Sequence, residues 1–283
     1  METIPTLPEA DSARGAARAL LAFWRAAGVD MDEAEAVFAR PAVQPAAPAP
    51  AAPKPAQGRA RPAPAIARPM VADAPIEAAR AAAAAATSLP ALKAAVEGFG
   101  LCGLKATARS TVFADGAMDA RVLLIGEAPG KEEDEQGKPF VGRSGRLLDR
   151  MLASIGLSRQ ENLLISNIIY WRPPGNRDPN PAEIAVCMPF VERLIALMRP
   201  DLVLLAGGAA AQAVLQRQEG VTKMRGKALT INRPGVGEPV NAMVMLHPAY
   251  LLRRPQEKRL AWADLLTIEA KLEGLGVSRA ATP

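Results

Sequence analysis

The amino-acid sequence predicts an α/β domain in which a parallel sheet is wrapped by helices. Two observations support this fold class. After Thr87, short apolar runs with strand-like composition alternate with longer amphipathic stretches, the pattern of strands alternating with helices. In addition, the starts of the helical stretches are well marked by capping residues. The four candidate strands are residues 121–126, 163–170, 202–206 and 242–247.

The helical stretches between these strands carry clear signals. Leu148, Leu152 and Ile155 recur at the spacing that places them on one helical face. Asn180 and Glu183 form the N-cap and the capping-box acid of the next helix. A final helix is expected over residues 257–275, with an apolar stripe to which we assign a purely structural role: Leu265, Ile268, Leu272 and Leu275.

The chain divides into a helical module at residues 1–40, a linker at residues 41–75 and the α/β domain at residues 76–283. In the linker, 23 of 35 residues are proline or alanine, which cannot build a core, so we expect a semi-flexible basic tether. Apolar residues at helical spacing, followed by Gly28, predict the helical module. This module either packs on the main domain or docks a protein partner.

Composition excludes several classes of protein. No apolar run approaches the ~20 residues of a membrane helix, and the N-terminus lacks the charged and apolar segments of a secretory signal. We therefore expect a cytoplasmic protein without a membrane partner, and a monomer. Cys102, Cys187 and the one histidine, His247, are too few for a disulfide scaffold or a four-thiolate metal site. The net charge of +5 is mildly basic and indicates no strong cationic patch.

Residues just past the apolar runs are the informative ones, because open α/β sheets bind ligands at the carboxyl ends of their strands. The first run leads into GEAPG at 126–130 and GKPFVG at 137–142, and the others end in Ser-Asn at 166–167, Gly-Gly at 207–208 and HPAYLLR at 247–253. The GEAPG turn lacks the glycine spacing of a dinucleotide site and places a carboxylate where a pyrophosphate would lie. No Walker lysine pattern occurs either, so nucleotide cofactors and phosphoryl transfer are disfavoured.

Together, these loop ends bring a carboxylate, an aromatic ring, an amide and an imidazole to one rim. That set suits a planar, hydrogen-bonding ring such as a nucleobase. Phe140 can stack on the ring, the amide of Asn167 can donate and accept at its pairing edge, and His247 can donate to a carbonyl oxygen. We expect such a base to lodge between the ring of Phe140 and the imidazole of His247.

In this order, the motifs resemble the uracil-DNA glycosylase superfamily, specifically its family 4. The resemblance covers roughly residues 91–272, and it also includes RPPGNR at 172–177 and RGK at 225–227. It implies a four-stranded parallel sheet flanked by helices, DNA binding across the strand ends, and a deoxyuridine flipped into the pocket. The implied function is a monofunctional uracil-DNA glycosylase that leaves an abasic site and initiates base excision repair.

The resemblance also implies roles for individual residues. Phe140 matches the base-stacking ring, Asn167 the uracil-reading amide and His247 the imidazole at uracil O2. Glu133 could face the C5 edge of uracil and help to exclude thymine. The remaining substrate-binding residues are Gly126 and Ala128. The expected DNA contacts are Ser144, Gly208, Lys227 and Arg253, with Leu251 or Leu252 entering the duplex beside Arg253.

Catalysis requires stabilisation of the uracil anion that departs as the glycosidic bond breaks. A donor at O2 in a water-excluded site acts where this charge develops, and His247 is our candidate. Related family 1 enzymes carry an aspartate where this sequence has Ala128. We therefore choose Glu127, the nearest carboxylate, as the second catalytic residue, orienting either the attacking water or His247. For Glu127 and Glu133 alike, the alternative is an acidic loop that caps the following helix.

Members of family 4 usually hold a [4Fe-4S] cluster on four cysteines. Cys102 and Cys187 match two of these, whereas the other two positions fall on Phe99 and Trp171. Two thiolates do not meet the four-ligand requirement of the cluster. We therefore predict a variant with no cluster and no metal, in which the two aromatic rings fill the vacated space.

Two further functions remain open at this point. A non-catalytic uracil-DNA-binding or repair-scaffold protein would keep the pocket and recruit partners through its N-terminal module. A nucleoside N-glycosidase would not need the Leu252–Arg253 wedge. Covalent trapping of uracil-DNA, which a related subgroup performs with a histidine on the loop at 172–177, is disfavoured because this loop has no histidine.

Overall fold

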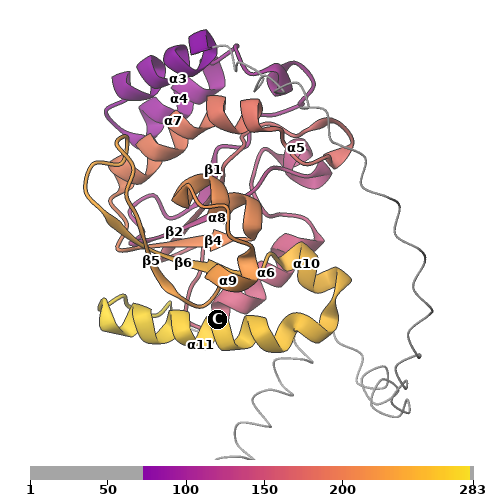
Figure 1. Cartoon of the computed structure of the whole chain (residues 1–283), viewed down its shortest axis with the longest axis vertical. Helices are drawn as coiled ribbons and strands as arrows, with labels where there is room; N and C mark the ends of the chain where they lie inside the picture. The colour runs from indigo at the N-terminus through magenta and orange to yellow at the C-terminus, as the bar shows by residue number, and fades with distance from the viewer. Residues whose placement is uncertain (1–72, 281–283) are drawn as a thin grey trace, which may run out of the picture. The chain divides into compact units, whose positions relative to one another are not determined.

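The structure, a computed structural model, describes residues 73–280 (Figure 1). The predicted module at residues 1–40 and nearly all of the predicted linker lie outside this range, so both remain predictions. Helix α3 (Asp73–Ala85) begins inside the stretch predicted as linker, two residues before Pro75. None of the helices within the described range is both long and apolar enough to cross a membrane.

Four parallel strands form the centre of the sheet: β2 (Val122–Gly126), β3 (Leu163–Asn167), β4 (Leu202–Ala206) and β6 (Val240–Met245). Every residue of β2, β3 and β4 is buried, as expected for parallel strands covered on both faces. The four predicted strands are therefore confirmed. Three differ at their ends: β2 starts at Val122 rather than at residue 121, β3 stops at Asn167 rather than at residue 170, and β6 spans 240–245 rather than 242–247.

Within the described residues the sheet has six strands, not four, in the order β1-β3-β2-β4-β6-β5. The additional strands, β1 (Ala114–Gly116) and β5 (Ala228–Ile231), pair antiparallel to β3 and β6 at the two edges. Their sequences carry no strand signal because β1 has only three residues and two of the four residues of β5 are exposed, so neither contains a buried apolar run.

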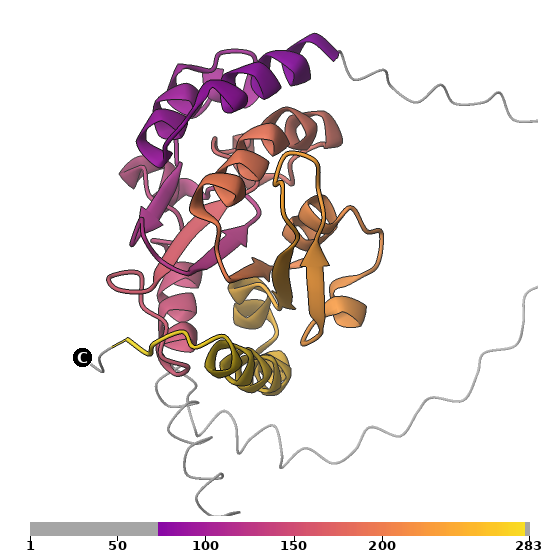
Figure 2. The same cartoon turned by 90° about the vertical axis from the view of Figure 1, so that its left-hand side faces the viewer.

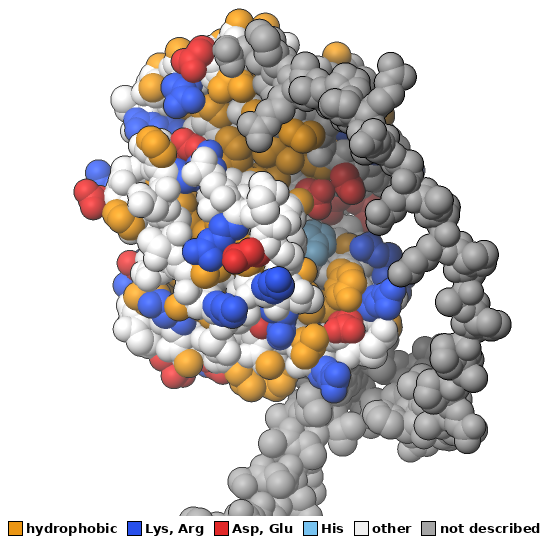
Figure 3. Space-filling view, in the orientation of Figure 1, with side chains coloured by type: hydrophobic (Ala, Val, Ile, Leu, Met, Phe, Trp, Pro, Cys, Tyr) orange, Lys and Arg blue, Asp and Glu red, His pale blue; other side chains and the backbone are white. Residues whose placement is uncertain are grey.

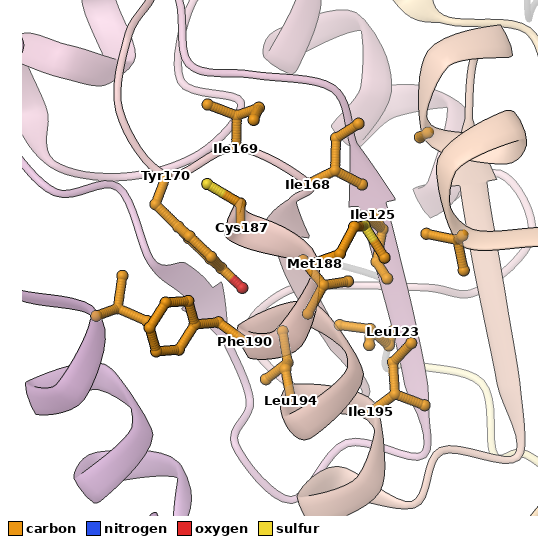
Figure 4. Packing of buried hydrophobic residues seen from close by; sticks show 14 of the residues in the cluster. Leu123, Ile125, Ile168, Ile169, Tyr170, Cys187, Met188, Phe190, Leu194 and Ile195 are labelled. Atoms are coloured by element: carbon orange, nitrogen blue, oxygen red, sulfur yellow. The ribbon is translucent and has the colours of Figure 1, made fainter. Parts of the chain in front are cut away.

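Helices cover both faces of the sheet (Figure 2). One layer contains α3, α4 (Leu89–Gly98), α7 (Pro181–Met198) and α8 (Gly208–Leu215). In Figure 4, Leu123 and Ile125 of β2 pack against side chains of α7, including Met188 and Ile195. The α7 N-terminus has the predicted capping box, in which Asn180 Oδ1 accepts from the Glu183 N–H at 2.9 Å and Glu183 Oε2 accepts from the Asn180 N–H at 2.8 Å.

The opposite face is covered chiefly by α6 (Arg143–Ala153) and α11 (Lys258–Gly274). Leu148 and Leu152 are buried on α6, and Ile155 is buried just beyond its end. In α11, three of the four predicted stripe residues are buried, while Leu275 forms the half-buried C-cap. The short elements are α5 (Lys131–Gln136), α9 (Val221–Met224), α10 (Pro248–Arg253), η1 (Gly103–Ala106), η2 (Pro174–Asn176) and η3 (Pro255–Glu257).

Candidate active site

A cavity of about 330 Å³ opens beside the carboxyl ends of the parallel strands. Figure 3 shows this hollow with the histidine inside it, acidic side chains on one side and lysines or arginines on the other. Parallel strands bring their carboxyl ends to one edge of the sheet, which explains why residues so far apart in sequence meet here. The residues predicted from sequence that line the cavity are Glu127, Ala128, Glu133, Phe140, Ser144, Asn167, His247 and Arg253.

Phe140 forms part of the cavity wall in an unusual backbone conformation. Its φ of 54° lies in the left-handed region, which bulky residues rarely adopt. Two glycines make room for it. A Cβ at Gly126 would lie 2.5 Å from both the Phe140 ring and Asn167 Oδ1, and a Cβ at Gly145 would lie 1.9 Å from the Phe140 carbonyl oxygen. Gly126, predicted to bind substrate, is not among the residues that line the cavity, but its lack of a side chain lets the Phe140 ring and the Asn167 amide lie close together.

Phe140 and His247 lie next to one another, with ring centroids 5.6 Å apart and an interplanar angle of 33°. A ring stacked between them would need two successive contacts of ~3.5 Å, or ~7 Å in all. The two rings are therefore too close together for a base to be sandwiched face to face between them. The two rings instead form adjacent parts of the wall, so a base can lie on Phe140 while one of its edges faces His247.

His247 is both a cavity residue and the N-cap of α10. Its Nδ1 accepts a hydrogen bond from the Ala249 N–H at 3.1 Å, so the proton of the neutral imidazole lies on Nε2. Burial and, to a smaller extent, the charge of Arg253 lower the pKa of His247 to about 4, although Glu133 opposes the shift. At neutral pH the side chain is therefore an uncharged donor through Nε2.

Asn167 presents an unsatisfied acceptor to the site. It is the last residue of β3, the whole residue is only 2% exposed, and its Oδ1 has no hydrogen-bond partner among the described residues. A buried acceptor without a donor is unfavourable by ~1–3 kcal/mol. The site is therefore suited to a ligand that brings an N–H to this oxygen.

The Glu133 carboxylate is engaged by backbone donors. Its Oε2 accepts from the Gly130 N–H at 3.1 Å, and its Oε1 accepts from the N–H groups of Val141 and Gly142 at 3.0 and 2.9 Å. These bonds tie the GEAPG turn to the loop that carries Phe140. A contact between Glu133 and the C5 edge of a base would compete with these bonds, so the structure favours the capping alternative for Glu133.

Glu127 lies in the cavity wall with a second carboxylate, that of Asp178. Burial raises the pKa of Glu127, and the negative charge of Asp178 raises it further. Sequence reasoning missed Asp178, as it missed the neighbouring cavity residues Pro173, Asn176, Arg177 and Pro179. The RPPGNR motif was the available signal, but linear position does not reveal that this loop folds across the cavity.

The loop at residues 172–179 is anchored to the start of α7. The Arg177 guanidinium donates to Glu183 Oε1 at 2.6 Å, to Glu183 Oε2 at 2.9 Å and to the Asp178 carbonyl oxygen at 3.0 Å. The same Glu183 caps α7, so one carboxylate joins the helix to the cavity loop. The hydrogen bonds from the Arg177 guanidinium and from the Asn180 N–H lower the pKa of Glu183.

The predicted DNA-contacting residues do not all reach one surface. Ser144 and Arg253 line the cavity, whereas Gly208 and the exposed Lys227 do not. Leu251 is fully buried, with 0% exposure, because it packs inward from α10. The prediction that Leu251 could enter the duplex is therefore wrong. The remaining candidate is the half-buried Leu252, beside the exposed Arg253.

The residues at the predicted cluster positions do not fit a [4Fe-4S] group. Cys102 and Cys187 are buried, and a hydrogen bond from Cys187 lowers the pKa of Cys102 to about 7. The other two positions hold packed rings. The rings of Phe99 and Phe190 make an edge contact with their centroids 5.1 Å apart, and Trp171 Nε1 donates to Thr111 Oγ1 at 3.0 Å. Two thiols and two aromatic rings do not supply the donors of a four-thiolate cluster.

A sheet with a cavity at the carboxyl ends of its parallel strands agrees with the fold expected of the uracil-DNA glycosylase class. The sequence model of the uracil DNA glycosylase superfamily matches residues 113–266, and the chain belongs to that superfamily. It is 38% identical over 159 residues to a "Type-4 uracil-DNA glycosylase" of Archaeoglobus fulgidus, covering 55% of this chain and 78% of that protein. The protein of the same name from Thermotoga maritima is 38% identical over 153 residues, or 54% and 77% of the two chains.

Proposed function

We propose that this protein is a monofunctional uracil-DNA glycosylase that hydrolyses the N-glycosidic bond of a deoxyuridine flipped out of DNA, the first step of base excision repair. Membership of the superfamily and the names of the relatives support this class of reaction. The single observation that carries the substrate assignment is the buried, unpartnered Oδ1 of Asn167 in the cavity wall.

The hydrogen-bond donors and acceptors of uracil are complementary to those of the Asn167 side chain. Its N3–H can donate to Asn167 Oδ1, while the amide nitrogen of Asn167 can donate to O4. Cytosine carries an acceptor at N3 and an amino group at position 4, so both contacts would be mismatched. Stacking of the flipped base on Phe140 adds affinity that does not depend on the identity of the base.

His247 supplies the donor for the leaving group. When the bond between C1′ and N1 breaks, its electron pair passes to uracil, and the negative charge is shared by N1 and O2. The neutral Nε2–H of His247 is suited to donate to O2, and it needs no external proton because the pKa of His247 is about 4. Removing such a preorganised donor typically slows a reaction by ~100- to 1000-fold.

We assign Glu127 to the side of the reacting sugar opposite the departing uracil. As a carboxylate it orients the attacking water, accepts its proton as the new bond to C1′ forms, and stabilises the positive charge that develops on the sugar. Its raised pKa brings it closer to the working pH, which favours proton transfer from water. Asp178 contributes by keeping this pKa high.

Ser144, Leu252 and Arg253 contact the DNA around the flipped nucleotide. Ser144 and Arg253 lie at the cavity, where a hydroxyl and a guanidinium can each bind a phosphate, and Leu252 occupies the space left in the duplex. Each phosphate neutralised by an arginine steepens the dependence of log affinity on log salt by about 0.9 for B-DNA. Gly208 and Lys227 would contact DNA farther from the cavity.

The enzyme works without a cluster or metal, as a cytoplasmic monomer, and residues 1–40 serve as its contact with a protein partner. The donor set at Cys102, Cys187, Phe99 and Trp171 supports independence from a cluster.

Release of labelled uracil from oligonucleotides containing U·G, U·A or single-stranded uracil tests the proposal. We expect stoichiometric release in a single turnover and an alkali-labile abasic site. Tight binding to uracil-containing DNA without release would contradict an enzymatic function and support a non-catalytic binding or scaffold protein. Release from free deoxyuridine that is indifferent to salt would instead indicate a nucleoside N-glycosidase.

A further inference from the structure

The backbone of Phe140 is held in place by a side chain that lies outside the cavity wall. A phenylalanine keeps a left-handed conformation such as φ 54° only where its surroundings hold it there. The Arg159 guanidinium provides such a hold. Its Nη2 donates to the Phe140 carbonyl oxygen at 3.0 Å, and its Nη1 donates to the Pro139 carbonyl oxygen at 3.1 Å.

Arg159 is itself fixed by two carboxylates from different elements. Its Nη1 donates to Asp115 Oδ2 of β1 at 2.9 Å, and its Nε and Nη2 donate to Asp149 Oδ1 of α6 at 3.0 and 2.7 Å. The side chain is only 11% exposed, so these bonds operate with little competition from water. Only a planar fork with several donors can reach two carbonyls and two carboxylates together, and a lysine cannot replace it.

The loop is gripped from its other side as well. Glu133 accepts the N–H groups of the two residues that follow Phe140, while Arg159 donates to the carbonyls of Pro139 and Phe140. The two side chains thus bind opposite polar groups of the same short stretch. Glu133 belongs to the cavity wall, whereas Arg159 does not, so Arg159 can influence a bound base only through the loop.

We infer that Arg159 is a positioning residue for uracil excision, which fixes the Phe140 ring at the angle where the flipped base stacks on it. This role rests on the proposed function. When Arg159 is removed, the loop can relax from its left-handed conformation and the ring moves away from the base. A displacement of about 1 Å can lower a catalytic rate by ~100-fold.

Single-turnover excision by Arg159→Met and Arg159→Lys tests this inference, with Arg121→Met as the matched control. Arg121 also donates to two carbonyls, those of Leu275 and Gly276, at 3.0 and 2.7 Å, and it pairs with Asp201 far from the cavity. Both arginine losses should lower the unfolding temperature. Only the Arg159 variants should reduce the maximal excision rate, by about tenfold or more, and lysine should not restore it.

A double variant identifies the route of the effect. In a Phe140→Ala background, Arg159→Met should change the excision rate less than twofold, because the ring on which Arg159 acts has gone. Asp149→Asn weakens the ion pair that fixes Arg159, at a half-exposed side chain, and it provides the test if Arg159→Met does not fold. Its loss of excision rate should be smaller, and it should likewise vanish in the Phe140→Ala background.

The inference would be overturned by equal losses of rate in Arg159→Met and Arg121→Met, or by a full additional loss when Arg159→Met is combined with Phe140→Ala. A wild-type protein that releases no uracil would instead contradict the proposed function itself, and the role of Arg159 with it. Normal release by wild type and by all Arg159 variants would leave the proposed function in place and refute only the positioning role.

Discussion

The Nδ1 of His247 accepts the backbone N–H of Ala249 at 3.1 Å, so the residue that caps α10 also lines the base-sized cavity. This bond decides which imidazole nitrogen carries the proton. Because the N–H of Ala249 needs an acceptor at the start of the helix, the neutral tautomer with the proton on Nε2 is favoured. A structural requirement of the helix thereby prepares the donor that the proposed reaction needs.

Replacement of His247 by alanine should slow single-turnover uracil excision at least tenfold, and by up to ~1000-fold, because the donor to the uracil anion is lost. The affinity for DNA should change little, since Ser144 and Arg253 are retained. Quenched-flow release of uracil and fluorescence anisotropy with the same oligonucleotide measure the two effects. A variant that loses affinity and rate in parallel would show that His247 mainly supports the fold of α10.

The acid side of the pH–rate profile should report Glu127 and not His247. The pKa of His247 is about 4, so this side chain is already neutral above roughly pH 5, whereas burial and the charge of Asp178 raise the pKa of Glu127. Excision should therefore fall as the pH is lowered through the pKa of Glu127, because the carboxylate becomes protonated.

Asp178→Asn should move this acid limb to lower pH, because it removes the negative charge that helps to raise the pKa of Glu127. Glu127→Gln should lower the rate and abolish the limb. Single-turnover rates across the acidic range measure both changes. Full activity in Glu127→Gln would remove Glu127 from the mechanism, and an unshifted limb in Asp178→Asn would remove the coupling between the two carboxylates.

Asn167→Asp should weaken the discrimination between uracil and cytosine. The substituted carboxylate keeps an acceptor but no longer donates to O4 of uracil, which we expect to reduce uracil excision by roughly 10- to 100-fold. Excision from matched oligonucleotides containing uracil or cytosine measures the ratio. Asn162→Asp serves as the control, because that amide lies in a distant turn where it donates to carbonyls. An unchanged ratio in Asn167→Asp would contradict the assigned reading of the pairing edge.

Protein purified anaerobically should contain iron and sulfide well below one equivalent of a cluster, and chelation should leave excision unchanged. The reason is the donor set, in which Phe99 and Trp171 occupy two of the four positions that a cluster would require. Elemental analysis and the visible absorption spectrum check this outcome. Stoichiometric iron and sulfide would show that Cys102 and Cys187 recruit other ligands.

Much of the fold could be predicted because its signals are local. The apolar runs of β2, β3, β4 and β6 are buried on both faces, and the Asn180–Glu183 capping box marks a helix start within four residues. The edge strands β1 and β5 escaped prediction because partly exposed, short strands have no characteristic apolar pattern. Their pairing depends on neighbours that are remote in sequence.

The types of side chain available at the site follow from the amino-acid sequence: an amide, an imidazole, a carboxylate and a ring, each placed at the end of a strand or in a loop with a recognisable motif. How these side chains meet depends on the tertiary structure. It showed that Phe140 and His247 are adjacent, that Leu251 faces the core, that Asp178 lies in the cavity wall with Glu127, and that Arg159 holds the Phe140 loop. Motifs record residue types, whereas side-chain direction and long-range contacts arise from the packing of segments distant along the chain.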